Sequence, residues 1–345
     1  MSSCQTLLRT SLRSNRPTAS SLLSLPQGQG LRIVPYRVGS SSRTYHHHYH
    51  AAAASASASS NEALLPIQPK VEDLLSYPDD VVRLMKMERR HDDSINGAHH
   101  WFPYLDNFRC GADASLTLTS AEVLEALSPH ILDVRKDKFR NVVRNRTYSL
   151  CLVVEGLCDL GNVSATFRSA DALGFQSVHV VSCDSKRYRD NRHVSMGAEK
   201  WLDIELWNSI HDCFQVLKSR GYRIATTHVG MDAVSIYDMD WSQPTAIVVG
   251  NENRGITNEA LELSDLHCSI PMKGMVDSFN VSVAAGILMH HAVCDRKSRL
   301  GYHGDLTSEE SQILLAEFSL RHSKSAISIA HEYAKRKSVM LTPKL

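Results

Sequence analysis

The chain has 345 residues, with 38 Lys and Arg against 37 Asp and Glu, a formal net charge of +1 at pH 7, and 43% hydrophobic residues. This hydrophobic content is ordinary for a globular protein. No apolar run approaches the roughly 20 residues that a membrane-spanning helix needs. We therefore expect a globular protein without a membrane segment, built as one large domain with appendages or as two modest domains.

The charge is unevenly distributed along the chain. Residues 1–61 contain six Arg but no Lys, Asp or Glu, and Ser and Ala dominate the remainder. An Arg-rich, Ser-rich and acid-free leader is typical of an organelle transit peptide, so we expect a chloroplast or mitochondrial protein; an untargeted tail is the alternative. Without these six Arg, 32 basic residues stand against 37 acidic ones, a net charge of −5. Contacts with nucleic acid must then come from local basic patches.

The cysteines do not form a metal or disulfide pattern. None of the eight forms a Cys-x-x-Cys pair, and several lie in apolar stretches such as residues 150–154. They are interpreted as small buried hydrophobic residues, and neither a metal site nor a disulfide framework is expected.

The elements before the first apolar strand are weakly patterned. Residues 62–115 are mixed in composition, and we expect an irregular extension there with a short charged helix over 81–90. Thr119 followed by Glu122 is a capping-box pattern, which predicts the start of a helix. The helical stretch that follows is basic and contains Arg135, Lys136, Lys138, Arg140, Arg144 and Arg146.

From residue 148 onward, apolar runs alternate with helical stretches. Strands are predicted over 148–155, 176–182, 222–228, 245–250 and 267–271, and helices over 163–173, 210–220, 258–263 and 281–296. Strands without polar alternation, separated by helices, indicate an α/β fold with a mostly parallel sheet covered by helices on both faces. Ligands of such folds bind in loops at the carboxyl ends of the strands.

The loop after the first of these strands carries two candidate functional residues. Asn162 is predicted to cap the next helix. Arg168 lies further along that helix, and its planar charged group suits a phosphate or a developing oxyanion. A surface arginine paired with a carboxylate is the alternative interpretation.

Two later loops share this polar character. Residues 250–256 place two glycines around a polar centre, which lets backbone approach a ligand closely, although a plain turn has the same pattern. Residues 270–286 place Ser278 and Asn280 at the predicted N-terminus of a helix of small residues, where amides and hydroxyls face a ligand. Simple helix capping is the alternative there.

Several common catalytic signatures are absent from the sequence. It contains no GxGxxG fingerprint and no GxxxxGK[ST] loop, which disfavours a nucleotide-binding dehydrogenase and a P-loop enzyme. Neither HExxH nor GxSxG occurs.

Taken together and in this order, the three loops closely resemble the three motifs of the SpoU/TrmH branch of the SPOUT methyltransferases. The resemblance runs from about residue 116 to about residue 299. It implies transfer of a methyl group from S-adenosyl-L-methionine to a ribose 2′-hydroxyl of RNA. It also implies a C-terminal trefoil knot, which is a rare exception to the rule against threading, and a homodimer with the active site at the subunit interface.

The resemblance assigns roles to particular residues. The positions matching the catalytic motifs are Asn162, Arg168, Glu252, Ser278 and Asn280. The positions matching the donor-binding groups are Thr227, Gly250, Asn251, Ile270, Met272 and Phe279, the last of which is commonly Leu in the family. Because the pKa of an arginine exceeds about 12, Arg168 is a poor base. We expect it to orient the ribose and stabilise the forming alkoxide, with an RNA phosphate as the candidate proton relay.

The N-terminal and C-terminal extensions help to predict which RNA is the substrate. We divide the chain into a leader (1–61), an irregular extension (62–115), a knotted methyltransferase domain (116–300) and a C-terminal helical extension (301–345), whose helix Thr307 and Glu310 are predicted to cap. Short helical extensions at both ends resemble those of TrmH enzymes, which methylate guanosine in the D-loop of tRNA, so tRNA is favoured over rRNA. The basic helix is the predicted RNA contact, with a solvated helix face as the alternative.

Two other functions stay open at this point. One is a methyltransferase acting on organellar rRNA. The other is a catalytically inactive RNA-binding or assembly factor with a vestigial knot, against which the intact Asn162, Arg168, Glu252, Ser278 and Asn280 argue.

Overall fold

A computed structural model shows the fold of the chain. It describes residues 85–89, 100–110, 116–157, 159–181, 192–251 and 254–341. The predicted leader, most of the extension over 62–115 and the predicted catalytic Glu252 lie outside the described residues. The chain divides into two units, and the second, Leu64–Leu345, contains every described element. Within the described ranges, no helix is both long and apolar enough to cross a membrane.

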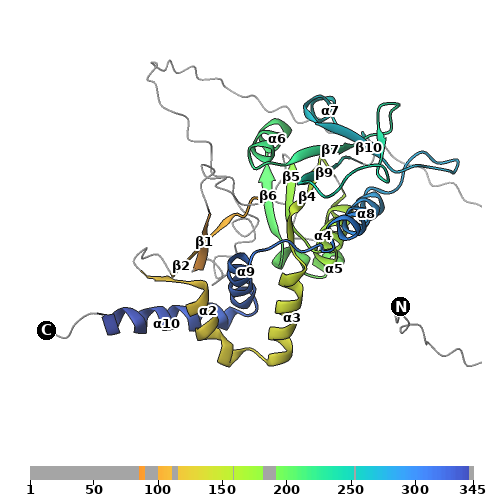
Figure 1. The fold of residues 1–345 in the computed structure, drawn as a ribbon. Helices are drawn as coiled ribbons and strands as arrows, with labels where there is room; N and C mark the ends of the chain where they lie inside the picture. The colour runs from red at the N-terminus through yellow and green to blue at the C-terminus, as the bar shows by residue number, and fades with distance from the viewer. Residues whose placement is uncertain are drawn as a thin grey trace, which may run out of the picture. The chain divides into compact units, whose positions relative to one another are not determined.

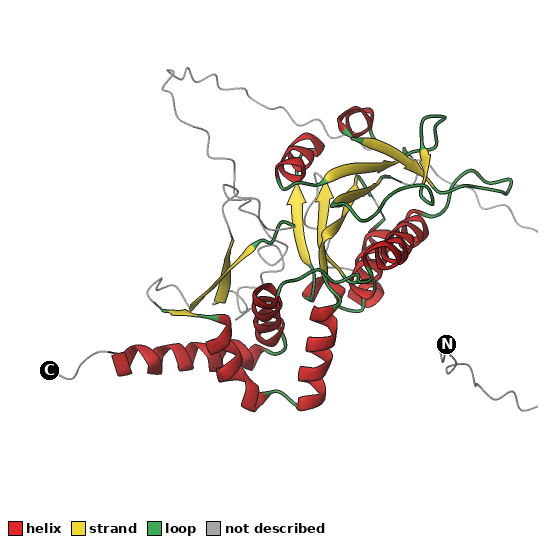
Figure 2. Ribbon diagram, viewed as in Figure 1, coloured by secondary structure: helices red, strands yellow, loops and turns green. Residues whose placement is uncertain are grey.

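A seven-stranded sheet forms the centre of this unit (Figures 1 and 2). Its strands are β4 (Thr147–Glu155), β5 (Phe175–Val181), β6 (Asp203–Trp207), β7 (Arg223–Thr227), β8 (Val234–Ser235), β9 (Thr245–Val249) and β10 (Leu266–Ser269). They lie in the order β6-β5-β4-β9-β7-β10-β8, and every pairing is parallel. The predicted α/β class with a parallel sheet is therefore confirmed, whereas the trefoil knot stays a prediction.

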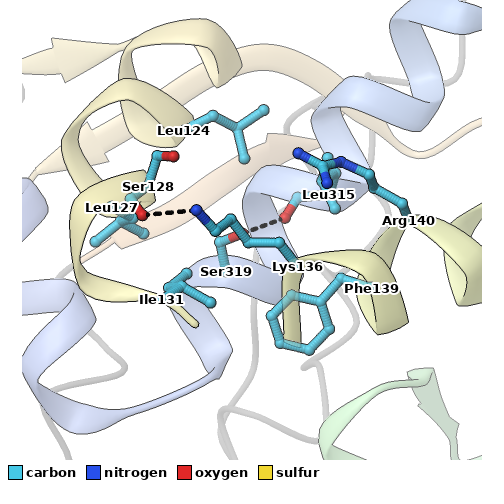
Figure 3. Close-up of a pocket in the computed structure, with 9 residues that line it drawn as sticks. All are labelled: Leu124, Leu127, Ser128, Ile131, Lys136, Phe139, Arg140, Leu315 and Ser319. Atoms are coloured by element: carbon cyan, nitrogen blue, oxygen red, sulfur yellow. Dashed lines mark hydrogen bonds between the residues drawn. The ribbon is translucent and has the colours of Figure 1, made fainter. Parts of the chain in front are cut away.

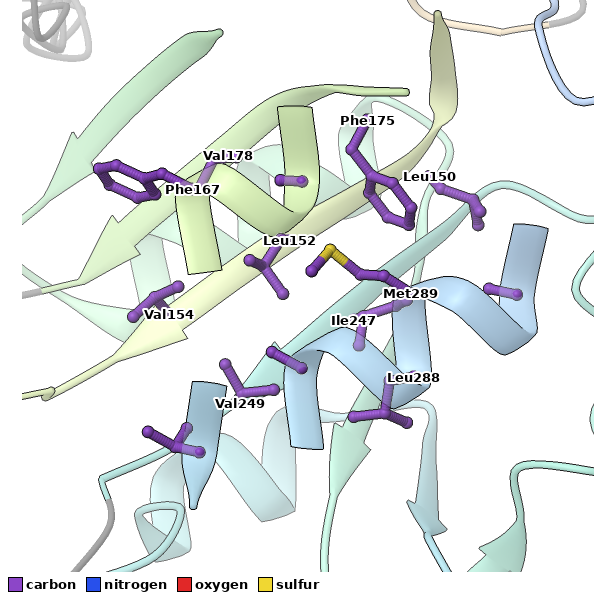
Figure 4. Close-up of a cluster of buried hydrophobic side chains, with 14 of the residues drawn as sticks. Leu150, Leu152, Val154, Phe167, Phe175, Val178, Ile247, Val249, Leu288 and Met289 are labelled. Atoms are coloured by element: carbon purple, nitrogen blue, oxygen red, sulfur yellow. The ribbon is translucent and has the colours of Figure 1, made fainter. Parts of the chain in front are cut away.

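Helices cover both faces of the sheet. They are α4 (Leu160–Ala172), α5 (Arg192–Ser195), α6 (Ile210–Ser219), α7 (Asn258–Leu263) and α8 (Val281–Leu300). Alternate side chains of β4 face opposite ways, because successive residues of a strand point to opposite faces. Leu152 packs on the α4 and α8 side with Phe167 and Met289 (Figure 4), whereas Val153 packs on the α6 side with Phe214. Burial on both faces explains why β4 shows no polar alternation.

The two ends of the described chain form a second core. Most of its buried side chains come from the strands β2 (Tyr104–Cys110) and β3 (Thr117–Leu118) and from the helices α2 (Ser120–Leu127), α3 (Asp133–Arg144), α9 (Ser308–Arg321) and α10 (Lys324–Leu341). A short 3-10 turn, η2 (Ser128–His130), follows α2, and β1 (Met85–Arg89) pairs with β2 in an antiparallel sheet with the order β1-β2-β3. Capping boxes begin α2 at Thr119 and α9 at Thr307, as predicted. The helix predicted over 81–90 was wrong. In the described part of this segment, 85–89, Met85 and Met87 alternate with charged residues, and these residues pair with β2 as a strand.

The sequence patterns also missed β6, the edge strand of the sheet. This strand contains Asp203 and Glu205, which are both buried. Carboxylates in a strand obscure its hydrophobic pattern, and they are tolerated only when they are paired. Asp203 accepts hydrogen bonds from the hydroxyls of Tyr104 and Tyr148, and Arg220 pairs with Glu205 at 3.1 Å.

A buried carboxylate, that of Asp305, joins the end of α8 to the start of β4. Nη2 of Arg296 lies 3.3 Å from Oδ2 of Asp305, and both side chains are almost fully buried. The carboxylate also accepts hydrogen bonds from the Thr147 hydroxyl at 2.5 Å and from the backbone N–H of Tyr148 at 3.2 Å. Asp305 therefore holds the connection between α8 and α9 against β4.

We expect Asp305→Ala to lower the free energy of unfolding by about 3–5 kcal/mol, because it leaves the Arg296 charge buried without its partner. Asp137→Ala breaks the exposed pair with Arg140 and should cost less than about 1 kcal/mol. Urea unfolding followed by circular dichroism measures both values. Equal effects of the two substitutions would show that the buried pair does not support the fold.

Candidate active site

Four strand ends lie side by side at one edge of the sheet. Because β4, β9, β7 and β10 are consecutive neighbours and parallel, their carboxyl ends meet there. The three loops singled out in the sequence follow β4, β9 and β10. The sheet order thus brings together segments that are more than a hundred residues apart in the chain.

The first loop leads into α4, and its capping residue differs from the prediction. The side chain of Asp159 caps the helix by accepting from the Gly161 N–H at 2.7 Å. Asn162 lies inside the first turn, so its predicted role as the cap was wrong. Its side chain is instead directed to the third loop, where Oδ1 of Asn162 accepts a hydrogen bond from Nδ2 of Asn280 at 3.0 Å.

Asn280 uses both ends of its amide. Its Oδ1 accepts from the Ser282 N–H at 3.0 Å and from the Ser282 hydroxyl at 2.6 Å, which caps the N-terminus of α8. Its Nδ2 donates to Asn162. The predicted helix cap and the predicted functional position are therefore one residue, and it ties α8 to α4. Further along, a Cβ at Gly286 would lie 4.0 Å from Oγ of Ser169, so the small residues of α8 do allow close packing on α4.

The second loop is closed on itself and tied to the first. The backbone groups of Asn251 and Gly255 exchange hydrogen bonds in both directions. A side chain at Gly250 would place its Cβ 2.7 Å from the Gly255 carbonyl oxygen, so only glycine fits the close approach. Nδ2 of Asn251 donates to the Gly156 carbonyl at 2.7 Å, which links this loop to the end of β4.

Glu155 supports the same loop and was missed by the sequence patterns. This buried carboxylate, the last residue of β4, accepts from the Thr257 hydroxyl at 2.5 Å and from its N–H at 3.2 Å. Thr257 in turn caps α7. The acidic end of an otherwise apolar strand was the available signal, and its partner could not be deduced from spacing because it lies 102 residues away.

The other predicted catalytic residues that the structure describes, Arg168 and Ser278, take no part in the hydrogen bond between Asn162 and Asn280, which we call the bridge. Arg168 is exposed on α4 and makes no hydrogen bond or ion pair with any residue that the structure describes. Ser278 is exposed in the third loop. The structure thus brings Asn162 and Asn280 together, leaves Arg168 and Ser278 open to a ligand, and does not describe Glu252.

The residues predicted to hold the methyl donor lie at or just beyond the carboxyl ends of three strands. Thr227 ends β7 and pairs with Cys268 of β10. Ile270 and Met272 follow β10 directly, Gly250 and Asn251 follow β9, and Phe279 adjoins Asn280 with 42% of its side chain exposed. Half-buried apolar side chains beside a side-chain amide and closely approaching backbone suit a ligand with both an aromatic and a polar part. These residues therefore fit a nucleoside-type methyl donor. Among the described residues, no cluster of three His, Cys, Asp or Glu side chains is placed to hold a metal ion.

The six residues predicted to contact RNA separate into three groups. Arg146 was wrongly included: it lies beyond α3, is fully buried, and donates to the Phe175 carbonyl at 2.9 Å while pairing with Asp171. A buried, paired arginine cannot reach a phosphate. Lys138, Arg140 and Arg144 are exposed on α3.

Arg135 and Lys136 have local partners. Arg135 lies over the Phe139 ring at 5.0 Å. Lys136 pairs with Asp133 at 2.7 Å and donates to the Ser128 carbonyl at 3.1 Å, across a pocket that α2, α3 and α9 line (Figure 3). These two side chains are held along the helix surface rather than projecting freely.

A doubly covered parallel sheet with joined loops at its carboxyl edge defines a ligand-binding α/β protein. A family model described as the SpoU rRNA Methylase family matches residues 149–290. A tRNA (guanosine(18)-2′-O)-methyltransferase of Aquifex aeolicus is 31% identical over 55% of this chain and 90% of its own length. The enzyme of that name from Escherichia coli (strain K12) is 36% identical over 51% of this chain and 78% of its own length.

A solved structure agrees with these relatives. The A. aeolicus TrmH/SpoU tRNA modifying enzyme is 30% identical, with a TM-score of 0.51, over 55% of this chain and 97% of that one. The chain belongs to the SpoU/TrmH family of 2′-O-methyltransferases.

We expect Asn280→Ala to lower the free energy of unfolding by about 0.5–2 kcal/mol, because it removes the cap of α8. Asn280→Asp keeps a capping oxygen but lacks the N–H that donates to Asn162, so its stability should stay near that of the native protein. Urea unfolding measures both variants. A loss in Asn280→Asp as large as that in Asn280→Ala would show that the bridge to Asn162, not the cap, stabilises this edge.

Proposed function

We propose that this protein transfers a methyl group from S-adenosyl-L-methionine to the ribose 2′-hydroxyl of guanosine 18 in tRNA. The observation that carries the proposal is the bridge between Asn162 and Asn280, which joins two motif loops at the edge where a parallel sheet binds ligands. The relatives named for this activity support it, because the chain spans 90% of the Aquifex enzyme. We assign the activity of these relatives to the three motif loops of this chain, which follow β4, β9 and β10.

Methyl transfer depends more on how the methyl donor and the ribose hydroxyl are positioned than on general acid–base catalysis. When bound, S-adenosyl-L-methionine would supply the methyl group of its sulfonium and leave as a neutral thioether, while the hydroxyl proton would pass to a phosphate oxygen of the RNA, the candidate proton relay. Holding two reactants in line can supply about 7–11 kcal/mol of the barrier. Thr227 at the end of β7 and the assigned residues after β9 and β10 hold the methyl donor. Arg168, exposed and without a described partner, binds the ribose and stabilises its developing negative charge.

The proposed active form is a homodimer. Large apolar side chains are exposed in and just after the third loop, including Met275, Val276, Phe279 and Val283. A group of exposed apolar residues of this kind marks an interaction site. A second copy covering it would approach Asn280 and the donor residues, which supports an active site completed at the subunit interface.

The RNA and the compartment are proposed on separate grounds. The chain covers most of the length of its tRNA-modifying relatives, which favours tRNA over organellar rRNA. The acid-free composition of residues 1–61 supports import into a chloroplast or mitochondrion. The basic side chains that remain exposed on α3 are the proposed contacts for the RNA backbone.

We expect Arg168→Ala to reduce single-turnover methylation of a tRNA transcript by about 100-fold or more, because it removes a charged group that stabilises the transition state. Binding of S-adenosyl-L-methionine, measured by calorimetry, should persist. Arg168→Lys keeps the charge but lacks the planar fork, so it should recover only part of the rate. Lys297→Ala, at the far end of α8, is the control. Near-native turnover in Arg168→Ala would remove Arg168 from the mechanism.

The same assay tests the substrate. A transcript with guanosine at position 18 should be methylated, whereas one with 2′-deoxyguanosine there should not. Preferential methylation of a ribosomal-RNA fragment would replace tRNA with the alternative substrate. A native protein that does not bind the methyl donor would favour the catalytically inactive RNA-binding or assembly factor.

We expect joint replacement of Lys138, Arg140 and Arg144 by Gln to weaken tRNA binding. For each phosphate that the variant no longer neutralises, the slope of log affinity against log salt concentration should become less steep by about 0.7–0.9. Lys218→Gln is the matched control, because Lys218 is exposed on α6 and pairs with Asp265 at 2.8 Å. An unchanged slope in the triple variant would identify α3 as a solvated surface.

A further inference from the structure

The segment after β7 crosses a neighbouring strand beside the proposed donor site. Thr227, the last residue of β7, pairs with Cys268 of β10, and Val234, the first residue of β8, also pairs with Cys268. Because β10 lies between β7 and β8 in the sheet, residues 228–233 must cross β10 at this level. We call residues 228–233 the crossing loop. Its two ends are fixed by backbone hydrogen bonds to β10.

A histidine of β10 holds the middle of the crossing loop. Nδ1 of His267 donates to Oδ2 of Asp232 at 2.6 Å, and Nε2 donates to the Leu261 carbonyl oxygen of α7 at 3.1 Å. A carboxylate and a carbonyl only accept hydrogen bonds, so both ring nitrogens must carry a proton. His267 is therefore an imidazolium, and its contact with Asp232 is an ion pair between β10 and the crossing loop.

Packing around this contact is close. The rings of His228 and His267 make an edge-to-face contact with centroids 5.5 Å apart. A Cβ at Gly230 would lie 2.6 Å from the His228 ring and 2.7 Å from Oδ1 of Asp232, so a larger residue there would have to displace these side chains. Met231 and Val229 are exposed, so they do not anchor the loop by burial. The His267–Asp232 pair is thus the side-chain contact that fastens the loop's centre.

We propose that His267 and Asp232 act as positioning residues that fasten the crossing loop over β10 and thereby set the affinity for the methyl donor. This inference rests on the proposed function. The link is geometric: Thr227 immediately precedes the loop, and Ile270 follows His267 by three residues on β10 and its extension. Thr227 and Ile270 are both assigned to the methyl-donor site. Breaking the His267–Asp232 contact would therefore loosen the backbone on both sides of that site.

The clamp formed by His267 and Asp232 has a defined pH dependence. The hydrogen bond to Asp232 and then that to the Leu261 carbonyl raise the pKa of His267 above 6.5, while partial burial opposes the rise. The hydrogen bond from His267 lowers the pKa of Asp232 below 3.8, and His228 is the other titratable group facing this carboxylate. The clamp is therefore present below the raised pKa of His267 and is lost as the pH rises through it. On the acid side it persists until the lowered pKa of Asp232 is reached.

Calorimetric titration of the full-length protein with S-adenosyl-L-methionine between about pH 6 and about pH 9 tests the clamp, since histidine titrates there. In the native protein, the dissociation constant should rise with pH. His267→Gln and Asp232→Asn should weaken binding about two- to fivefold at a pH below the raised pKa of His267, as expected for a partly exposed ion pair, and should flatten the pH profile. Asp238→Asn makes the same charge change on an exposed residue just after β8 and should match the native profile.

A second set of measurements tests the His267–Asp232 ion pair without the methyl donor. The NMR titration of His267 should show a raised pKa in the native protein and a lower one in Asp232→Asn. Amide hydrogen exchange of the crossing loop should accelerate in both clamp variants but not in Asp238→Asn.

These measurements separate the two proposals. A native protein that does not bind the donor would overturn the proposed function, and with it the donor-affinity role of the clamp, while the NMR and exchange data would still decide whether the clamp exists. An unchanged His267 titration in Asp232→Asn would disprove the ion pair. Native donor affinity and a native pH profile in both clamp variants would disprove its effect on the site.

Discussion

The pairing of β4 with both β5 and β9 is the constraint on which the rest of the structure depends. Every residue of β4 is buried, and its ladder to β9 aligns Val154 with Val249, so the two strands end at the same level. The loops that follow them consequently start together. Glu155 and Gly156, just beyond the ladder, then bind Thr257 and Asn251 of the second loop. The position of one strand thus places two motif loops.

The third loop reaches this edge by a different route. It follows β10, which is separated from β9 by β7. The side-chain amide of Asn280 connects the third loop to the first, because its oxygen caps α8 while its nitrogen donates to Asn162 on α4. The site is therefore assembled by hydrogen-bonded side chains on regular elements, which hold a geometry more precisely than mobile loops do. Arg168 is left exposed at the side of this assembly.

The extensions are bound to the methyltransferase core through buried charge. Asp203 and Asp305 accept hydrogen bonds from tyrosine and threonine residues of the first strands, and they pair with Arg321 and Arg296 respectively. Such pairs are costly to break, because removing one partner leaves an uncompensated buried charge. The N-terminal residues 100–110, which the sequence patterns left irregular, are held in this way.

The sequence by itself determined the class of fold and the identity of the loops. Apolar runs such as 148–155 and 245–250 define buried parallel strands by their lack of alternation, and local capping patterns at Thr119 and Thr307 needed only neighbouring residues. Tertiary structure decided which residues act together. Asn162 bonds to Asn280 over 118 residues, Arg146 is buried rather than exposed on a basic helix, and β1 is a strand because β2 lies beside it. Local periodicity carries information about neighbours in the chain, whereas these contacts depend on the order of strands in the sheet.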